Sequence, residues 1–162
     1  MANIAFEVVP ATLAETGTLL PILRDAEEGE ERIRAALLDP ACVAYAARNG
    51  GELLGATVVR WESTRTGEIL YIAVRADVRG QGYGKLMLKA LQTEAVGRGA
   101  SALLVGTANS SLENIAFYQK CGFRMFAVKR DYFTYIQPPL QEHGIMMRDM
   151  LLFSYEQKDT FL

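Results

Sequence analysis

Histidine and cysteine are scarce in this chain of 162 residues, which holds one histidine and two cysteines. A single histidine, His143, excludes a metal centre built from several histidines. Cys42 and Cys121 lie far apart among apolar neighbours. We interpret them as two reduced thiols of a cytoplasmic protein, and expect neither a disulfide nor a zinc site. The chain is therefore expected to bind no metal.

An excess of one charge and long apolar runs are also missing. The 17 basic and 19 acidic side chains leave a formal net charge of −2, which gives no broad electrostatic surface for DNA or RNA. The apolar runs are far shorter than the ~20 residues that span a bilayer, and residues 1–7 lack the features of a signal peptide. Half of the residues are hydrophobic, which is too many for a disordered chain. We expect one folded domain, residues 1–162, that binds neither nucleic acid nor a membrane.

The hydrophobic pattern predicts strands and helices in alternation. The spacing of Thr12 and Glu15 is that of a capping box and predicts the start of a first helix, with Leu13 and Leu19 on its apolar face. Early antiparallel hairpins and one β-α-β crossover indicate an α/β (α+β) fold, in which helices flank a mixed, mostly antiparallel central sheet. Strands are expected at residues 6–9, 42–48, 52–61, 67–75, 102–107, 123–129 and 145–155. Helices are expected from residue 12, at 30–38, at 85–98 and from 111 or 112 to 120.

The most informative segment is rich in glycine and lies between a predicted strand and a predicted helix. It reads Arg79-Gly80-Gln81-Gly82-Tyr83-Gly84-Lys85. Glycines there let the backbone turn tightly and leave free N–H groups at the positive end of a helix dipole, which is an anion site suited to phosphate. A Walker loop has four residues between its first glycine and a Gly-Lys pair, and serine or threonine follows that pair. Here only three residues separate Gly80 from Gly84-Lys85 and a leucine follows, so the spacing does not fit. It does not fit a dinucleotide fingerprint either, because the glycines are evenly spaced.

The segment Arg79–Gly84 resembles the pyrophosphate loop of the GNAT superfamily of N-acetyltransferases. Residues 109–123 resemble the second signature of that family, an asparagine followed by a helix with Phe117-Tyr118 and then by Gly122-Phe123. The order of strands and helices matches over nearly the whole chain. The resemblance implies the GNAT fold and an acetyltransferase that moves the acetyl group of acetyl-CoA directly to a primary amine of a small molecule or a protein.

The resemblance also assigns residues to the acetyl-CoA site. The backbone of the loop is expected to bind the pyrophosphate, and the strand that ends at Val74 is expected to pair with the pantetheine arm. The residues expected to bind the cofactor are Ile72, Ala73, Val74, Arg79, Gly80, Gln81, Gly82, Tyr83, Gly84, Lys85, Asn109, Asn114 and Phe117.

Three side chains are candidates for proton transfer. An alkylamine with a pKa of about 10.4 is protonated at pH 7, so a base must remove a proton before the amine can attack. Glu68 resembles the glutamate that opens this strand in the histone-acetylating branch of the family, although a solvated carboxylate at a strand end is the alternative. Tyr118 matches the position of the general acid of the family, and its alternative is a core tyrosine. His143 is an auxiliary base candidate, or else a surface histidine.

Residues 130–144 form a longer connection between the last two predicted strands than a hairpin needs. We expect its aromatic side chains and its histidine to face the acceptor, although they could also pack on their own core. The substrate-binding candidates are Trp61, Tyr132, Phe133 and His143. Apolar residues of the last predicted strand, among them Leu151 and Phe153, suggest strand pairing in a homodimer.

Two other classes of function stay open from the sequence. A non-catalytic sensor that binds acyl-CoA would keep the glycine loop, but it would not need both Glu68 and Tyr118. A structural protein without a cofactor would not need Arg79 beside three glycines. The sequence does not identify the acceptor amine.

Overall fold

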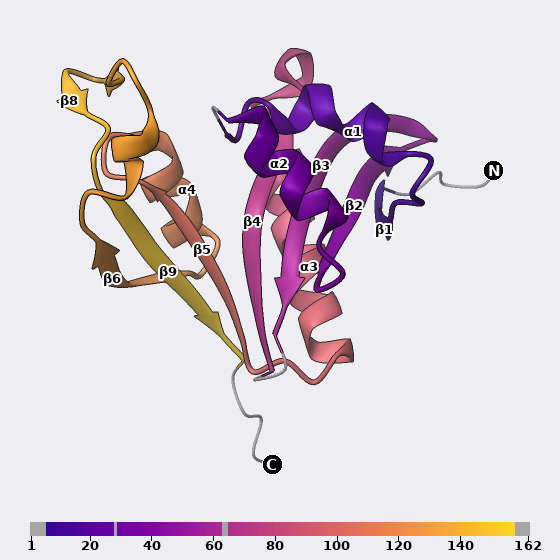
Figure 1. Cartoon of the computed structure of the whole chain (residues 1–162). Coiled ribbons are helices and arrows are strands. Elements are labelled where there is room, and N and C mark those ends of the chain that lie inside the picture. The colour runs from indigo at the N-terminus through magenta and orange to yellow at the C-terminus, as the bar shows by residue number, and fades with distance from the viewer. Residues whose placement is uncertain (1–5, 28, 63–64, 158–162) are drawn as a thin grey trace.

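The structure is a computed structural model, and it describes residues 6–27, 29–62 and 65–157. The main feature of these residues is a seven-stranded sheet in the order β1-β2-β3-β4-β5-β9-β6 (Figure 1). The expected mixed, mostly antiparallel sheet with flanking helices is thereby confirmed. The ends of the expected domain, 1–162, and most of residues 1–7 lie outside the described residues.

The strands are β1 (Phe6–Pro10), β2 (Cys42–Asn49), β3 (Glu52–Trp61), β4 (Thr66–Val74), β5 (Ala102–Ala108), β6 (Arg124–Lys129), β7 (Gln141–Glu142), β8 (Ile145–Met146) and β9 (Met150–Glu156). The helices are α1 (Thr16–Leu23), α2 (Glu30–Leu38), α3 (Tyr83–Gly97) and α4 (Leu112–Lys120), with short 3₁₀ turns η1 (Ala76–Val78) and η2 (Tyr132–Tyr135). Apart from the first helix and the last strand, the expected elements are confirmed, with ends that differ by at most two residues.

The β4 and β5 strands run parallel, and α3 lies between them in the chain because parallel neighbours need a crossover connection. Their pairing is short, from Thr66 opposite Ala102 to Ile69 opposite Val105. Beyond Ile69 the two strands separate, and Figure 1 shows them converging at one end of the sheet and splaying apart toward the other. The splay leaves one edge of residues 70–74 without a partner strand among the described residues.

A bulge in β4 changes which of its side chains share a face of the sheet. Val58 lies opposite Tyr71 and Val59 lies opposite Ile69, so Leu70 is an extra residue in β4. Adjacent residues of β3 point to opposite faces. Tyr71 therefore lies on the face of Val58, whereas Ile69 lies on the face of Val59.

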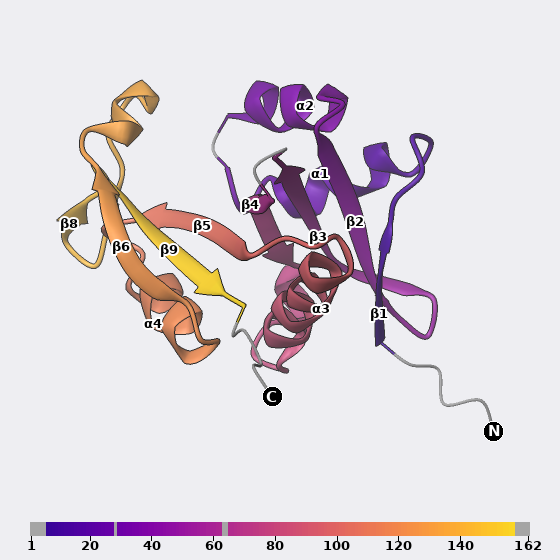
Figure 2. The same cartoon turned by 90° about the horizontal axis from the view of Figure 1, so that it is seen from below.

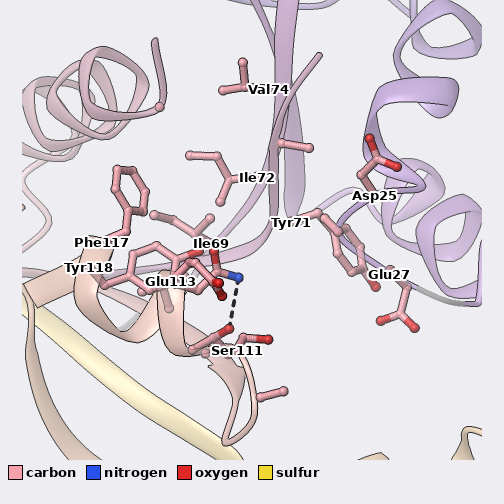
Figure 3. Close-up of a pocket in the computed structure, with 18 of the residues that line it drawn as sticks. Asp25, Glu27, Ile69, Tyr71, Ile72, Val74, Ser111, Glu113, Phe117 and Tyr118 are labelled. Atoms are coloured by element: carbon pink, nitrogen blue, oxygen red, sulfur yellow. Dashed lines mark hydrogen bonds between the residues drawn. The ribbon is translucent and has the colours of Figure 1, made fainter. Parts of the chain in front are cut away.

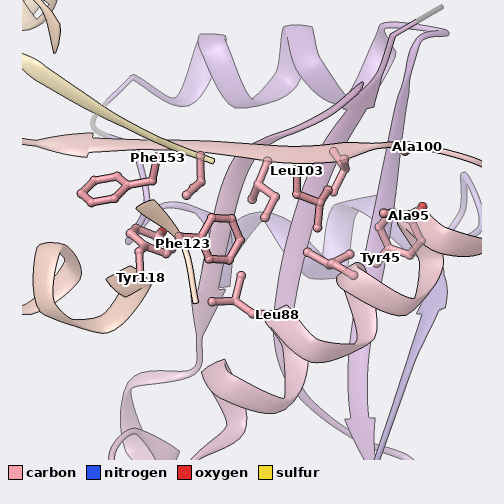
Figure 4. Close-up of a cluster of buried hydrophobic side chains, with 12 residues drawn as sticks. Tyr45, Leu88, Ala95, Ala100, Leu103, Tyr118, Phe123 and Phe153 are labelled. Atoms are coloured by element: carbon pink, nitrogen blue, oxygen red, sulfur yellow. The ribbon is translucent and has the colours of Figure 1, made fainter. Parts of the chain in front are cut away.

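Helices cover both faces of the sheet, with α1 and α2 on one side and α3 and α4 on the other (Figure 2). Each side has its own apolar cluster. Leu88, Leu103 and Phe153 are fully buried on the side of α3 and α4 (Figure 4). Leu19 and Leu23 of α1 are fully buried in the cluster on the other side. The apolar stripe of each helix thus fixes the sheet between two layers.

The first helix begins later than expected. It starts at Thr16, and Thr12 and Glu15 form no capping box. Instead, the backbone N–H of Glu15 donates a hydrogen bond to the carbonyl oxygen of Thr12 (2.9 Å), which makes a turn. Leu13 is 80% exposed and not part of the apolar face, while Leu19 is buried as expected. The capping-box prediction is wrong because a turn before the helix uses the same spacing.

The strand expected at residues 145–155 is two elements, β8 and β9. The side chain of Asn109 accepts hydrogen bonds from the backbone N–H groups of Arg148 and Asp149 (2.9 and 3.0 Å), in the segment between these two elements. β8 pairs with β7 in a small hairpin instead. β9 lies between β5 and β6 with both edges paired, and Phe153 is fully buried. β9 therefore has no free edge for strand pairing between subunits, and the homodimer itself stays a prediction.

None of the helices within residues 6–27, 29–62 and 65–157 is long and apolar enough to cross a membrane. The same residues contain no group of three or more His, Cys, Asp or Glu side chains placed to hold a metal ion. Cys42 and Cys121 are both free thiols, as expected.

Candidate active site

A pocket of about 1110 Å³ opens where β4 and β5 splay apart. It is larger than the ~300–1,000 Å³ of most small-molecule sites, so it has room for a long ligand. Side chains from opposite sides of the splay meet in it, with Glu27 and Tyr71 on one side and Phe117 and Tyr118 on the other (Figure 3). Ile72 lies between them (Figure 3).

The glycine-rich loop forms one end of this pocket. Gly80 and Gly82 have φ angles of 78° and 87°, in the left-handed region that glycine alone adopts easily. Gly82 is also the N-cap of α3. No backbone N–H of residues 82–85 donates a hydrogen bond to any residue that the structure describes. These donors lie at the positive end of the α3 dipole, which is an arrangement that suits an anion, and anion binding by the loop stays a prediction.

The unpaired edge of β4 continues from the loop into the pocket. Ile72 and Val74 line the pocket, whereas Ala73 also belongs to the apolar cluster under α1 and α2. An unpaired strand edge offers N–H and C=O groups to any extended chain that carries amides. The edge therefore suits a ligand with peptide-like groups.

Arg79 is bound by the protein itself. Its Nε donates a hydrogen bond to the carbonyl oxygen of Val74 (3.1 Å), and its Nη2 pairs with the Asp25 carboxylate just after α1 (2.6 Å). These contacts join the glycine loop to the α1 layer. Arg79 thus positions the loop, and its expected direct contact with a pyrophosphate stays a prediction.

The other loop residues differ in their access to the pocket. Tyr83, Gly84 and Lys85 line it, whereas Gln81 does not. The ring of Tyr83 also stacks on Phe6 of β1, with 5.8 Å between the ring centroids. The stacking holds the first turn of α3 against the edge of the sheet.

Helix α4 forms the pocket wall next to α3. The Asn114 side chain donates a hydrogen bond to Oγ1 of Thr107 in β5 (3.3 Å). The Phe117 ring packs on the start of α3, where a Cβ added at Gly84 would lie 3.1 Å from Cζ of the ring. Asn114 and Phe117 both line the pocket, as expected of cofactor-binding residues.

Tyr118 lines the pocket from α4 and is only 5% exposed. The rings of Phe117, Phe123 and Phe153 surround it, with centroids 5.4, 5.9 and 5.8 Å away. Burial, helped by nearby Cys121, raises the pKa of the phenol well above its ordinary value. The hydroxyl therefore keeps its proton at neutral pH and can act as a hydrogen-bond donor.

Cys121 also lines the pocket, directly after α4. Burial raises the pKa of its thiol, and nearby Lys85 opposes that rise only in part. The thiolate is the reactive form of cysteine, so a raised pKa lowers the share of Cys121 that is reactive at neutral pH.

Glu68 lies near the closed end of the splay, opposite Arg60 of β3 and Leu104 of β5. It is half-buried and lines the pocket. The bulge at Leu70 places Glu68 and Tyr71 on the same face of the sheet, the one that α1 and α2 cover. Its carboxylate therefore approaches the pocket from the side opposite to Ile72.

Trp61 and Asn109 were expected at the site but, like Gln81, do not line the pocket. The indole N–H of Trp61 donates a hydrogen bond to the Tyr45 hydroxyl (3.0 Å), and the Arg98 guanidinium lies over the indole ring (4.6 Å from Cζ to the centroid). Trp61 thus packs in the core beside α3. Asn109 holds the segment before β9, as described above. The structure gives both residues a supporting place in the fold.

The insertion at residues 130–144 brings its aromatic residues to the pocket and leaves its histidine outside the lining. Tyr132 and Phe133 line the pocket. His143 does not, and its Nε2 lies 2.8 Å from the Glu113 carboxylate at the pocket wall. Glu142 lines the pocket as well, and one of its oxygens accepts hydrogen bonds from Ser110 and Ser111.

Sequence reasoning named neither Glu27 nor Tyr71 as a site residue, and it covered Tyr135 only among the aromatic side chains of the insertion. Tyr71 had a signal, because it directly precedes Ile72 in the strand. Glu27 had none, because its contact with the hydroxyl of Tyr135 joins residues 108 positions apart in the chain (2.8 Å). Burial and the nearby Glu27 charge raise the pKa of Tyr71 to about 12.

Comparison with known proteins agrees with this geometry. The model of the acetyltransferase (GNAT) family matches residues 13–123. The chain belongs to the GNAT acetyltransferase family. It is 39% identical over 109 residues to YvbK of Bacillus subtilis strain 168, an uncharacterized N-acetyltransferase, and the match covers 66% of this chain and 70% of YvbK. The GNAT resemblance seen in the sequence is thus confirmed.

Solved structures of this family show the same architecture. The IAA acetyltransferase from Bacillus cereus ATCC 14579 is 35% identical with a TM-score of 0.80, and the match covers 94% of this chain and 99% of that one. A GNAT family acetyltransferase from Elizabethkingia anophelis, crystallised with acetyl-CoA bound, is 30% identical with a TM-score of 0.86, over 97% of this chain and all of that one. The expected GNAT fold is confirmed.

Proposed function

We propose that this GNAT acetyltransferase moves the acetyl group of acetyl-CoA directly to a primary amine. The observation that carries the proposal is the glycine-rich loop, residues 79–85, with unpaired N–H groups at residues 82–85, at one end of a pocket centred between splayed strands. The acetyl-CoA bound in the similar Elizabethkingia anophelis structure supports it.

The residues along the pocket fit acetyl-CoA in the order of its chemical groups. The free N–H groups of residues 82–85 suit the pyrophosphate. The unpaired edge at Ile72–Val74 suits the two amides of the pantetheine arm. The thioester then lies between Ile72 and Tyr118. When bound, acetyl-CoA supplies the acetyl group and a thiolate leaving group.

Glu68 is our candidate for the base, directly or through a water molecule. Removing a proton at pH 7 from an amine with a pKa of about 10.4 costs roughly 4.6 kcal/mol, from 3.4 units at 1.36 kcal/mol each. Glu68 lines the pocket on the face that Tyr71 also occupies, away from the glycine loop. An amine entering from the α1 side would therefore meet this carboxylate before it reaches the acetyl group.

Tyr118 is our candidate for the donor to the leaving sulfur. Full proton transfer from an ordinary phenol to a thiolate with a pKa near 8.5 is already uphill by about 2 kcal/mol. Burial raises the pKa of Tyr118 further above that of the thiolate. We infer that Tyr118 acts by a hydrogen bond to the sulfur as negative charge develops there. The raised pKa of the Cys121 thiol disfavours an acyl-cysteine, and we propose that the amine attacks the thioester directly.

The experiment that tests the proposal mixes the protein with acetyl-CoA and a panel of primary amines and follows release of the free CoA thiol. We expect thiol release that depends on at least one amine, with the N-acetylated amine as product. Binding of CoA by calorimetry without thiol release would favour the acyl-CoA sensor instead. The homodimer and the cytoplasmic location stay predictions.

A further inference from the structure

The α1 side of the pocket carries a cluster that the transfer chemistry described above does not use. We call Glu27, Tyr71, Tyr132, Phe133 and Tyr135 the acceptor box. All five residues line the pocket, and they come from the α1–α2 connection, from β4 and from the insertion. Figure 3 shows the hydroxyl end of Tyr71 beside Glu27, across the pocket from Tyr118. The box therefore faces the place where the acetyl group would lie.

The carboxylate of Glu27 is fixed in place and keeps bonding capacity. Its side chain is 9% exposed. Oε1 accepts hydrogen bonds from the Tyr135 hydroxyl (2.8 Å) and the backbone N–H of Gly29 (3.0 Å). Oε2 lies 3.5 Å from Nε of Arg32, which is too long for a strong hydrogen bond. Because a carboxylate has about four acceptor positions, Oε2 can still accept bonds from an ammonium group.

Arg32 braces the acceptor box and is not part of its lining. Its guanidinium donates to the Tyr132 hydroxyl (2.8 Å) and lies over the ring of Tyr135, with Cζ 4.3 Å from the centroid. The tyrosines are thereby held in place from behind. A rigid carboxylate among aromatic rings is the arrangement that binds organic ammonium ions.

Apolar side chains lie in the pocket lining together with the acceptor box. Leu140, Met147 and Met150 are among them. Of the other carboxylates of the lining, Asp25 is paired with Arg79 and Glu113 with His143, and Glu142 accepts hydrogen bonds from Ser110 and Ser111. Beyond Glu27 and Glu68, an acceptor with several positive charges would therefore meet no carboxylate of the lining that lacks such a partner in the structure. An acceptor with a carboxylate next to its amine would place a second negative charge beside Glu27.

We propose that the acceptor is a monoamine on an apolar or aromatic body without a neighbouring carboxylate, with its ammonium group bound by Glu27 and its body packed on the aromatic rings of the acceptor box. This proposal rests on the proposed acetyltransferase function and names its substrate class. Glu27 is then the residue that selects the acceptor, whereas the glycine loop and Tyr118 serve the acetyl donor.

The test compares three probes at saturating acetyl-CoA. They are 2-phenylethylamine, L-phenylalanine, which adds a carboxylate to the same body, and spermidine, which has several charges and no aromatic body. We expect kcat/KM for 2-phenylethylamine to exceed that for each of the other two at least tenfold. In Glu27→Gln, which keeps an acceptor oxygen for Tyr135, KM for 2-phenylethylamine should rise at least tenfold while KM for acetyl-CoA stays within twofold.

The matched control is Glu31→Gln. Glu31 lies in the first turn of α2, is exposed and does not line the pocket. The Glu31→Gln substitution therefore removes the same charge from the same region without changing the pocket. We expect it to leave every kinetic constant unchanged.

Equal or better use of spermidine or phenylalanine by the wild type overturns the substrate class, even if Glu27→Gln does not fold. An unchanged KM for 2-phenylethylamine in folded Glu27→Gln overturns the role of Glu27. Absence of thiol release with every amine instead contradicts the proposed function itself.

Discussion

Replacing Gly82 with aspartate is the sharpest perturbation of the acetyl-CoA site. Gly82 has a φ of 87°, and a Cβ added there meets no atom within 4 Å, so the new side chain enters open space beside the free N–H groups. The left-handed backbone costs a residue other than glycine about 1–2 kcal/mol. A carboxylate about 5 Å from a phosphate charge, at an effective dielectric constant of about 20, costs roughly 3 kcal/mol of binding free energy.

We therefore expect Gly82→Asp to weaken CoA binding by roughly 100- to 200-fold while the protein stays folded. The assay is calorimetric titration of CoA, with a thermal melt to establish folding. Gly99→Asp is the matched control, because Gly99 also has a positive φ of 70° and open space for a Cβ, but it does not line the pocket. It should lose similar stability and keep its CoA affinity. Equal CoA affinity in the two folded variants would refute the assignment of the loop.

Three further predictions concern single side chains. Tyr118→Phe should lower kcat by ~10–1,000-fold with little change in acetyl-CoA affinity when chemistry limits the rate. Because burial raises the pKa of Tyr118, its proton is kept below pH 10 and lost only as the pH rises through the raised value, so wild-type kcat should show no falling limb between pH 7 and 10. Glu68→Gln should lower kcat/KM by roughly 10–10⁴-fold at pH 7, and the loss should shrink toward the pKa of the amine; pH profiles that are parallel would exclude Glu68 as the base. Asn109→Ala should lower the free energy of unfolding by about 1–3 kcal/mol, measured by urea titration, because the N–H groups of the segment before β9 lose their acceptor.

The sequence was most informative where structure depends on neighbours in the chain. The glycine loop between a strand and a helix is such a case, because glycine at residues 80 and 82 directly permits the positive φ angles that the loop adopts. The apolar spacing of α3 is another. The first helix shows the limit of this reasoning, because a turn and a capping box share the spacing of Thr12 and Glu15 and only the structure separates them.

The acceptor side of the pocket was hidden in the sequence because distant segments build it. The bulge at Leu70 arises from pairing with β3, and it alone places Glu68 and Tyr71 on one face. The bond between Glu27 and Tyr135 requires the insertion to fold back over the α1–α2 connection. The places of Trp61 and Asn109 outside the pocket lining could not be predicted either, because the residues that they contact are distant in the chain. Trp61 contacts Tyr45 in the core, and Asn109 contacts the segment before β9.

Direct transfer of acetyl from acetyl-CoA to an amine in the pocket between β4 and β5 can be followed in a single-turnover experiment. It uses protein in excess over acetyl-CoA, an amine accepted in the steady state, and rapid quenching followed by mass spectrometry. We expect free CoA and the N-acetylated amine to appear with the same rate constant, neither to form without the amine, and the protein to gain no acetyl group. An acetylated protein that forms before the amine is added, and then transfers its acetyl group to that amine, would refute direct transfer.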